Sequence, residues 1–224
     1  MKRSEVNSYL VWAKELLEGS CIRLPRFAYW SMDEWRAHKD EIDNIVTVGQ
    51  GWDITDYGLD KYKEIGTVLF TVRNGSLVKP EAGVPYAEKY LLIMDGQRLP
   101  AHYHAAKTED IINRGGGLLS MRFYNSKEDG SMDFESDVTV YSDGLKMVVP
   151  AGKEILFERG NSVTITPGMY HIIAAKGGDL IAGEVSSIND DKTDNYFSEP
   201  VSRFSTIEED EPILHPLCNE YDKL

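Results

Sequence analysis

Between residues 66 and 188 the sequence alternates short apolar runs, rich in β-branched residues, with glycine, proline, asparagine or aspartate. The runs are GTVLFTVRNG, YLLIM, LLSMRFY, VTVY, LKMVV, VTITP, HIIAA and LIAGEVSSI. Such runs are typical of β-strands, and Asn74 followed by Gly75 predicts a turn after the first of them. Short strands at regular spacing favour an antiparallel sandwich or barrel over alternating strands and helices. The sequence therefore predicts an all-β fold.

The two ends of the chain differ from this strand-rich middle. Apolar residues recur at helical spacing near the N-terminus, and Ser31 with Glu34 forms a capping-box pattern before a second amphipathic stretch that Gly49 can end. Beyond position 188 the chain is polar and then loop-like, with scattered apolar anchors. At 224 residues and 42% hydrophobic content we expect one domain. It comprises an N-terminal helical extension (1–60), a core (66–188) and a C-terminal arm (189–224) wrapped on the strands.

Charge and hydropathy exclude several kinds of partner. The net charge is −13 and no basic stripe could follow a phosphate backbone, so we expect no nucleic acid partner. No apolar run approaches the roughly 18 residues that cross a bilayer, so we expect no membrane partner. The first apolar residues are interleaved with charges, unlike an export signal. Cys21 and Cys218 form no CxxC pair, which fits a reduced, cytoplasmic location.

The segment AHYHAAKTEDIINRGGG, residues 101–117, concentrates groups that bind metals. In an extended chain His102 and His104 point to one face, because strand side chains alternate with period two. Glu109 follows after a short connection and can return on the neighbouring strand with the same orientation, and the glycines at 115–117 allow a tight reversal after it. Two imidazoles and a carboxylate suit a first-row divalent ion such as Mn(II), Fe(II), Co(II), Ni(II) or Zn(II). Taken alone, HYH could equally be a surface histidine pair.

The wider spacing resembles the two motifs of the cupin family. Gly96, His102, His104, Glu109 and Gly116 follow the first cupin motif position by position, and TPGMYH, residues 166–171, resembles the second. This resemblance implies a cupin double-stranded β-helix, a jelly-roll barrel, in which His171 is the fourth metal ligand. The second motif departs from the family pattern, because its proline and glycine are adjacent. The remaining histidines, at 38 and 215, are expected to be ordinary polar residues.

A finer resemblance covers most of the chain. The segments EKYLLIMDGQRLPAHYHAAKTEDIINRGGG, TPGMYHIIAA and GEVSSINDDKTDN are similar to the D-lyxose isomerase family of sugar-isomerising cupins. The resemblance implies interconversion of D-lyxose with D-xylulose, and often of D-mannose with D-fructose, supported by Mn(II). It also implies that the protein is a homodimer whose small-molecule partner is a monosaccharide.

An aldose–ketose isomerase moves one proton between C1 and C2 of the sugar and another between O1 and O2. A divalent ion that chelates both oxygens stabilises the enediolate, and a positioned base transfers the carbon-bound proton. Glu184 lies in the late strand GEVSS among apolar neighbours, so we predict that it is this base. Lys107, beside the ligands, is predicted to protonate or orient the sugar oxygens. Lys89, Asp190 and Arg203 are candidates for binding hydroxyls.

Each of these residues also has an ordinary structural interpretation. Lysines beside a turn are usually solvated, Asp190 and Arg203 could only pin the arm, and Glu109 could serve as base instead of ligand. The same ligand set also occurs in dioxygenases and in binding proteins without catalysis, so the fold alone does not decide the reaction. Two alternatives to the isomerase therefore stay open: an iron-dependent dioxygenase and a non-catalytic sugar-binding cupin.

Overall fold

The computed structural model describes residues 1–191 and 193–224, and in these residues strands predominate. The helices are α1 (Arg3–Gly19), α2 (Met32–Ala37) and α3 (Asp43–Val48), with 3₁₀ turns at Arg26–Tyr29, Lys39–Glu41 and Tyr221–Lys223. The strands are β1 (Gly51–Thr55), β2 (Thr67–Gly75), β3 (Gly83–Ile93), β4 (His102–Tyr103), β5 (Glu109–Ser126), β6 (Met132–Asp133), β7 (Val138–Ser142), β8 (Leu145–Val149), β9 (Ile155–Phe157), β10 (Ser162–Ile165), β11 (Met169–Ser186) and β12 (Tyr196–Phe197).

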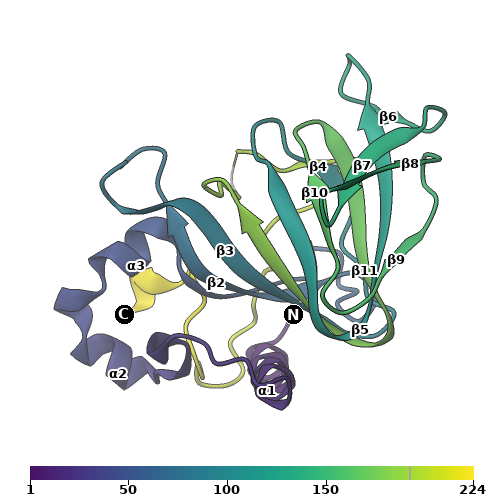
Figure 1. Cartoon of the computed structure of the whole chain (residues 1–224). Helices are drawn as coiled ribbons and strands as arrows, with labels where there is room; N and C mark the ends of the chain where they lie inside the picture. Colours follow the sequence, from purple (N-terminus) through teal and green to yellow (C-terminus); the bar gives the residue numbers. More distant parts are fainter. Residues whose placement is uncertain (192) are drawn as a thin grey trace.

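The strands form one strongly curved sheet (Figure 1). They pair antiparallel in the order β1-β2-β3-β11-β5-β10-β7-β8, and β4, β6, β9 and β12 attach to members of this path. The predicted all-β class is confirmed. Within the described part of the chain the hydrogen-bonded path does not return from β8 to β1, so the predicted barrel is open between these two strands.

The two longest strands, β5 and β11, are 18 residues each and pair with each other in the middle of the sheet. The runs HIIAA and LIAGEVSSI, predicted as separate strands, both belong to β11. The predicted reversal at the glycines 115–117 is wrong, because the chain continues through them as β5. A Cβ on Gly116, whose φ is 82°, would overlap the carbonyl of Asp179 on β11. Glycine is needed there because the two strands approach closely at a register shift.

Two other local predictions need correction. Asn74 and Gly75 are the last residues of β2, and a longer loop over residues 76–82 joins β2 to β3 in place of a tight turn. Asn74 is instead buried, where its side-chain amide donates to the carbonyl of Val48 at 3.2 Å. The second amphipathic stretch begins with the predicted capping box at Ser31, but it breaks after α2. At the break His38 stacks on Trp30 with ring centroids 4.3 Å apart.

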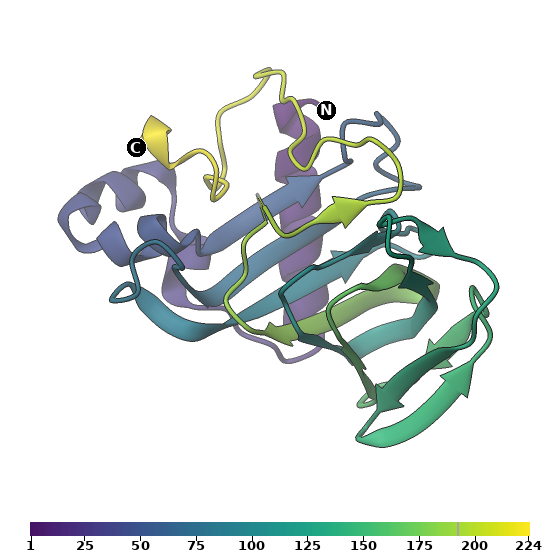
Figure 2. The same cartoon turned by 90° about the horizontal axis from the view of Figure 1, so that it is seen from above.

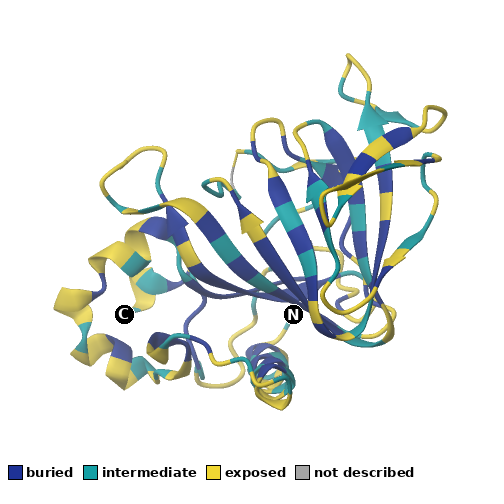
Figure 3. Ribbon diagram, viewed as in Figure 1, coloured by how far each residue is buried: buried dark blue, intermediate teal, exposed yellow. Residues whose placement is uncertain are grey.

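Two hydrophobic cores lie on opposite faces of β2 and β3; Figure 3 shows that β2 is buried along most of its length and β3 mainly in its second half. Side chains alternate along β2, so Leu69 joins the core enclosed by the sheet, whereas Val68 and Phe70 join the core under the helices. Helix α1 covers this second core with its predicted apolar face, Val6, Leu10, Ala13 and Leu17. No described helix is long and apolar enough to cross a membrane.

The C-terminal segment runs over the sheet and back to the helices (Figure 2). Its strand β12 pairs with β4, which holds the segment against the histidine motif. Farther on, Arg3 at the start of α1 contacts Glu209 at 2.7 Å and also pairs with Glu220. The segment therefore makes ordered contacts with both the strands and α1, as expected for a wrapping arm.

Candidate metal and sugar site

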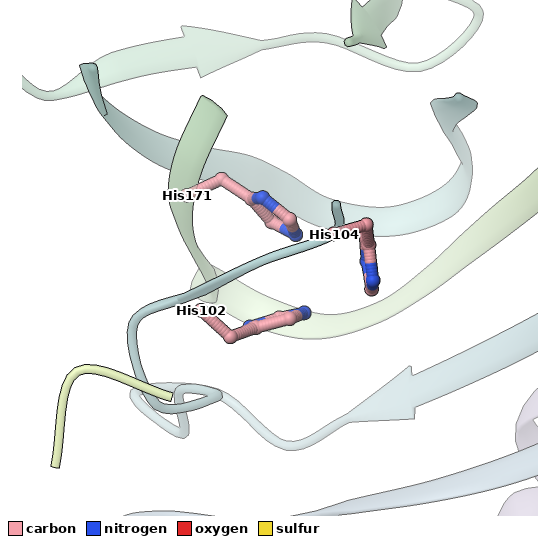
Figure 4. A group of neighbouring side chains, drawn as sticks. All are labelled: His102, His104 and His171. Carbon is pink, nitrogen blue, oxygen red and sulfur yellow. The ribbon is translucent and has the colours of Figure 1, made fainter. Parts of the chain in front are cut away.

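The predicted metal ligands meet at one end of the curved sheet (Figure 4). His102 on β4 pairs directly opposite His171 on β11, and the ring centroids of this pair are 4.2 Å apart. His104 follows two residues after His102, and Glu109 begins β5 after a four-residue connection. All four are buried, with exposed fractions of 8% for His102, 3% for His104 and Glu109, and 0% for His171. Positions about 70 residues apart in sequence are thus brought together.

The hydrogen bonds of the three imidazoles define their tautomers. The Nδ1 atoms lie 2.9 Å from the Pro100 carbonyl for His102, 2.6 Å from the Asp194 carbonyl for His104, and 3.1 Å from the Met169 carbonyl for His171. A carbonyl oxygen only accepts, so each Nδ1 carries the hydrogen and donates it. Each Nε2 is left with a free lone pair. This backbone-oriented imidazole is the usual form of a metal-binding histidine.

The free lone pairs converge on one point. The metal-binding nitrogens of the three histidines lie within 4.8 Å of one another, and among described groups Nε2 of His104 and of His171 have no hydrogen-bond partner. Oε1 of Glu109 is 3.4 Å from the first and 3.3 Å from the second. Lone pairs and a carboxylate repel one another unless a cation lies between them. This donor set fits a first-row divalent ion, as predicted from the sequence.

Glu109 is ionised in this environment. Burial alone would raise the pKa of its carboxyl, but the Lys107 ammonium opposes this and holds that pKa well below its usual range. Oε2 of Glu109 lies 2.6 Å from Nζ of Lys107. One oxygen therefore faces the imidazoles while the other binds the ammonium group.

Lys107 joins the metal ligands to the predicted base. Its Nζ donates to Oε1 of Glu184 at 2.9 Å and to Oδ1 of Asn189 at 3.2 Å. Burial would lower the pKa of Lys107, but the carboxylates of Glu109 and Glu184 outweigh burial and raise that pKa above its ordinary value. Lys107 is therefore an ammonium hydrogen-bond donor and not a base. The alternative interpretation of Lys107 as a solvated surface lysine is excluded by its 4% exposure.

The inner face of the strands explains why these groups share one pocket. On β11, Leu180 and Ala182 belong to the core enclosed by the sheet, and Glu184 continues the same face at period two. On β3, Leu91 follows the same core face, and Lys89 is two residues before it. The inward stripe of each strand thus changes from apolar to ionisable at the same end of the sheet. That end carries the site.

A chain of ion pairs leads away from Glu184. Lys89, opposite Glu184 in the sheet, has its Nζ 3.9 Å from Glu184 and 3.3 Å from both carboxylate oxygens of Asp191. Nη2 of Arg203 donates to Asp191 at 3.0 Å and to Asp53 at 2.7 Å. The structure therefore brings the predicted residues Lys89 and Arg203 to the site.

Asp190 does not line the pocket at the metal ligands, but it lines the larger cavity next to that pocket. Its carboxylate accepts from the backbone nitrogen of Thr193 at 3.1 Å and from the hydroxyl of the same residue, so it shapes a turn within the arm. The neighbouring Asp191 occupies the position between the two cations. Burial would raise the pKa of Asp191, but Lys89 and Arg203 outweigh burial and hold that pKa well below its ordinary range.

Sequence reasoning missed Asp191 and two other contributors. Asp53 on β1 fixes Arg203, and Asp194 contacts the histidine motif through its backbone and side chain. The polar run NDDKTDN showed several carboxylates in this part of the arm, but only the contacts across the fold select which of them face the site. Phe197 is also missed: its ring lies 5.5 Å from that of His102 and forms an apolar wall.

Comparisons with known proteins match nearly the whole chain to one family. A family model described as D-lyxose isomerase matches residues 1–221. A D-lyxose/D-mannose isomerase from Escherichia coli O157:H7 is 39% identical over an alignment that covers 99% of this chain and 98% of that protein. A protein with the same name from Serratia proteamaculans is 38% identical, again with 99% and 98% coverage.

Solved structures show the same fold at much lower identity. The L-ribose isomerase of Geodermatophilus obscurus matches with a TM-score of 0.58 and 15% identity, covering 93% of this chain and 98% of that one. An L-ribose isomerase of Cellulomonas parahominis with L-psicose matches with a TM-score of 0.59 and 14% identity over the same shares. These similarities confirm the predicted cupin-type fold, and the match to the family model together with 38–39% identity to curated relatives confirms the predicted family. The chain therefore belongs to the D-lyxose isomerase family of enzymes.

Proposed function

We propose that the protein interconverts D-lyxose with D-xylulose, and D-mannose with D-fructose, by metal-assisted proton transfer between C1 and C2. One observation carries this proposal: three histidines that could hold a metal ion, with the Glu109 carboxylate 3.3–3.4 Å from two of them, lie beside a buried carboxylate–ammonium pair, Glu184 and Lys107. The names of the curated relatives support the choice of sugars. The two alternatives, a dioxygenase and a non-catalytic binding protein, would also explain the metal-binding residues. Neither gives a role to the pair of Glu184 and Lys107.

We infer that His102, His104, His171 and Glu109 hold one divalent ion, with Mn(II) first and Co(II), Ni(II), Fe(II) and Zn(II) compatible with the same nitrogen and oxygen donors. When bound, such an ion supplies Lewis acidity to the neighbouring sugar oxygens. The orphaned Nε2 atoms of His104 and His171 support this assignment, because a buried polar atom without a partner is costly.

Glu184 and Lys107 have complementary roles in the proposed reaction. The Glu184 carboxylate removes the proton from C2 of the aldose and returns it to C1, while the hydroxyl proton moves from O2 to O1. No atom is gained or lost. The Lys107 ammonium exchanges its 3.2 Å contact with Asn189 for a hydrogen bond to the sugar oxygen that gains negative charge, and it holds Glu184 in place through its 2.9 Å contact. Apolar walls from Leu91, Ile111 and Phe197 limit the access of water.

The proposal is tested with Mn(II)-loaded protein and D-lyxose in deuterated water under nitrogen, with the product followed by NMR. We expect D-xylulose carrying deuterium at C1, because a proton held on Glu184 exchanges with solvent. The variant Glu184→Gln should keep its metal and lose roughly 10²- to 10⁴-fold in kcat. A matched control is Glu154→Gln, which alters a half-buried carboxylate that pairs with Lys176 and lies outside the site. Sugar consumption that requires oxygen, or full activity in Glu184→Gln, would contradict the proposal.

A homodimer, which the family resemblance implies, stays a prediction, as do the single domain expected from the chain length and the cytoplasmic location expected from the two cysteines. Light scattering on the purified protein checks the first, since a homodimer of this 25.3 kDa chain has twice that mass.

A further inference from the structure

The pocket at the metal ligands is too small for a sugar by itself. It has a volume of about 40 Å³ and is lined by His102, His104 and Glu109 together with Lys107, Glu184, Lys89, Asp191 and Arg203. Pockets that bind small molecules usually measure about 300–1,000 Å³. Only the two sugar oxygens nearest the metal ligands can occupy this pocket, so the rest of the sugar must lie outside it.

A larger cavity continues from this pocket. Its volume is about 600 Å³, and it shares Leu69, Lys89, Asp191 and Arg203 with the metal pocket. The two other sizeable cavities in the described part of the chain share no lining residue with the metal pocket. If the oxygens on C1 and C2 of a sugar face the metal ligands, the remaining carbons can therefore extend into the larger cavity.

Arg203 stands in the wall that both cavities share. Its Nη2 is held by Asp53 and Asp191, and its guanidinium carbon lies 5.0 Å from the ring centroid of Phe204, which fixes the plane of the group. Its other terminal nitrogen, Nη1, is buried and has no hydrogen-bond partner among the described residues. A guanidinium with one end fixed and the other without a partner is suited to recognise an added hydroxyl group.

The other buried polar atoms without a hydrogen-bond partner are not candidates for binding the distal part of the sugar. Nε2 of His104 and of His171 belong to the metal site. Trp35 Nε1 and Tyr62 Oη, the others in the described part of the chain, belong to residues that line neither the metal pocket nor the larger cavity. Arg203 Nη1 is therefore the donor at the site whose partner the fold itself does not supply.

We propose that the larger cavity is the subsite for the distal carbons of the sugar, and that Arg203 donates from Nη1 to a distal hydroxyl and so contributes to the turnover of six-carbon aldoses. This inference rests on the proposed isomerase function and assigns the direction in which the substrate extends. The apolar residues Leu69, Ile188 and Phe204 of the cavity wall face the carbon-bound hydrogens, as is common in sugar sites.

D-Mannose and D-lyxose make a matched pair for the test. They share the configuration at C2, C3 and C4, and D-mannose differs by its additional CH₂OH group. The variant Arg203→Lys keeps a cation for Asp53 and Asp191 but has no second terminal nitrogen. A hydrogen bond to a charged group contributes about 1.5–3 kcal/mol, so we expect kcat/KM for D-mannose to fall roughly 10- to 100-fold more than that for D-lyxose.

A second variant tests the cavity without changing the ion pairs. Asn219 lines the larger cavity, so the bulkier side chain of Asn219→Trp should narrow it. This variant should reduce kcat/KM for D-mannose more than that for D-lyxose. Inhibition constants of the unreactive polyols D-mannitol and D-arabinitol provide a binding readout that does not depend on turnover. Metal content and melting temperature confirm that each variant is folded and loaded.

The outcomes separate this inference from the proposed function. If the wild-type protein converts neither aldose, the proposed function is wrong. If it converts both, and Arg203→Lys and Asn219→Trp lower kcat/KM for the two sugars equally, the subsite is wrong but the isomerase function stands. A selective loss of D-mannose turnover, accompanied by weaker D-mannitol inhibition, supports the subsite.

Discussion

Nδ1 of His104 donates to the backbone carbonyl of Asp194 at 2.6 Å, although the two residues are 90 positions apart. The carboxylate of the same aspartate accepts from the backbone nitrogens of Ala105 at 2.8 Å, Ala106 at 3.1 Å and Lys107 at 2.9 Å. One residue of the arm therefore orients a metal ligand and the connection that carries the ammonium group. The arm belongs to the site as well as to the scaffold.

Replacing Asp194 by alanine should weaken metal binding. The backbone carbonyl remains, but the side chain that holds the connection over residues 105–107 is lost. Groups that orient metal ligands typically change metal affinity about 10- to 100-fold, so we expect an increase in Kd of that size, measured by competition with a chelator. Asp194→Asn keeps one acceptor oxygen and should give a smaller increase.

The matched control for this experiment is Asp143→Asn. Its carboxylate likewise accepts from a backbone nitrogen, that of Ser162 at 2.7 Å, but in an exposed turn outside the site. Metal affinity in this variant should equal that of the wild type. Equal affinity in Asp194→Ala would exclude a role of the Asp194 side chain in metal binding.

Metal binding should stabilise the fold through His171. A ligand at about 100 times its Kd adds about 2.7 kcal/mol to the free energy of unfolding, if it binds only the folded chain. Chemical denaturation with Mn(II) and with a chelator should show this increment in the wild type and not in His171→Ala. His38→Ala, at a histidine that pairs with Glu41 on the surface, should retain the increment.

Lys107→Met should reduce turnover while the protein stays folded. Methionine has a similar shape but cannot donate to the sugar or separate the carboxylates of Glu109 and Glu184. We expect kcat to fall roughly 10²- to 10⁴-fold, measured under metal saturation. Lys176→Met removes a half-exposed partner of Glu154 and should have normal kcat. Turnover in Lys107→Met within a few-fold of the wild type would exclude the proposed donor role.

The cluster of Arg3, Glu209 and Glu220 should make stability depend on acid pH. Hydrogen bonds from Arg3 lower the pKa of Glu209 from its ordinary 4.5 to about 2. A carboxyl whose pKa is lower in the folded state stabilises the fold fully above pH 4.5 and loses that contribution as the pH falls toward 2. Because the Glu209 side chain is 45% exposed, solvent screening makes this contribution smaller than the full shift implies.

The variant Arg3→Met tests this cluster. Glu220 is buried and would keep only Lys223 as a cationic partner, so removal of Arg3 should lower the free energy of unfolding by up to about 3 kcal/mol at neutral pH. The difference from the wild type should shrink between pH 4.5 and 2, as measured by urea denaturation. Arg36→Met breaks a surface pair with Asp33 and should change stability by less than about 1 kcal/mol. A difference that is constant with pH would exclude Glu209 as its source.

Much of the fold and of the metal centre follows from local patterns. The period of two places His102 and His104 on one face, and it aligns Glu184 with the apolar inner stripe of β11. The capping box at Ser31 likewise needs only residues within one turn of helix. These features depend on neighbours in the sequence, which is why they are predictable. The glycines near 116 were misinterpreted because the same conformational freedom serves both turns and close strand approach.

By itself the sequence determined the strand-rich class, the family and the four candidate ligands, because residue type and short-range spacing carry that information. Only the tertiary structure decided that Asp191 rather than Asp190 joins Lys89 to Arg203, and that Asp194 holds His104. The run NDDKTDN offers several similar carboxylates, and no local period orders a loop. Which of them faces the site depends on how the arm is held by β4 and by Arg3, through contacts between residues far apart in the chain.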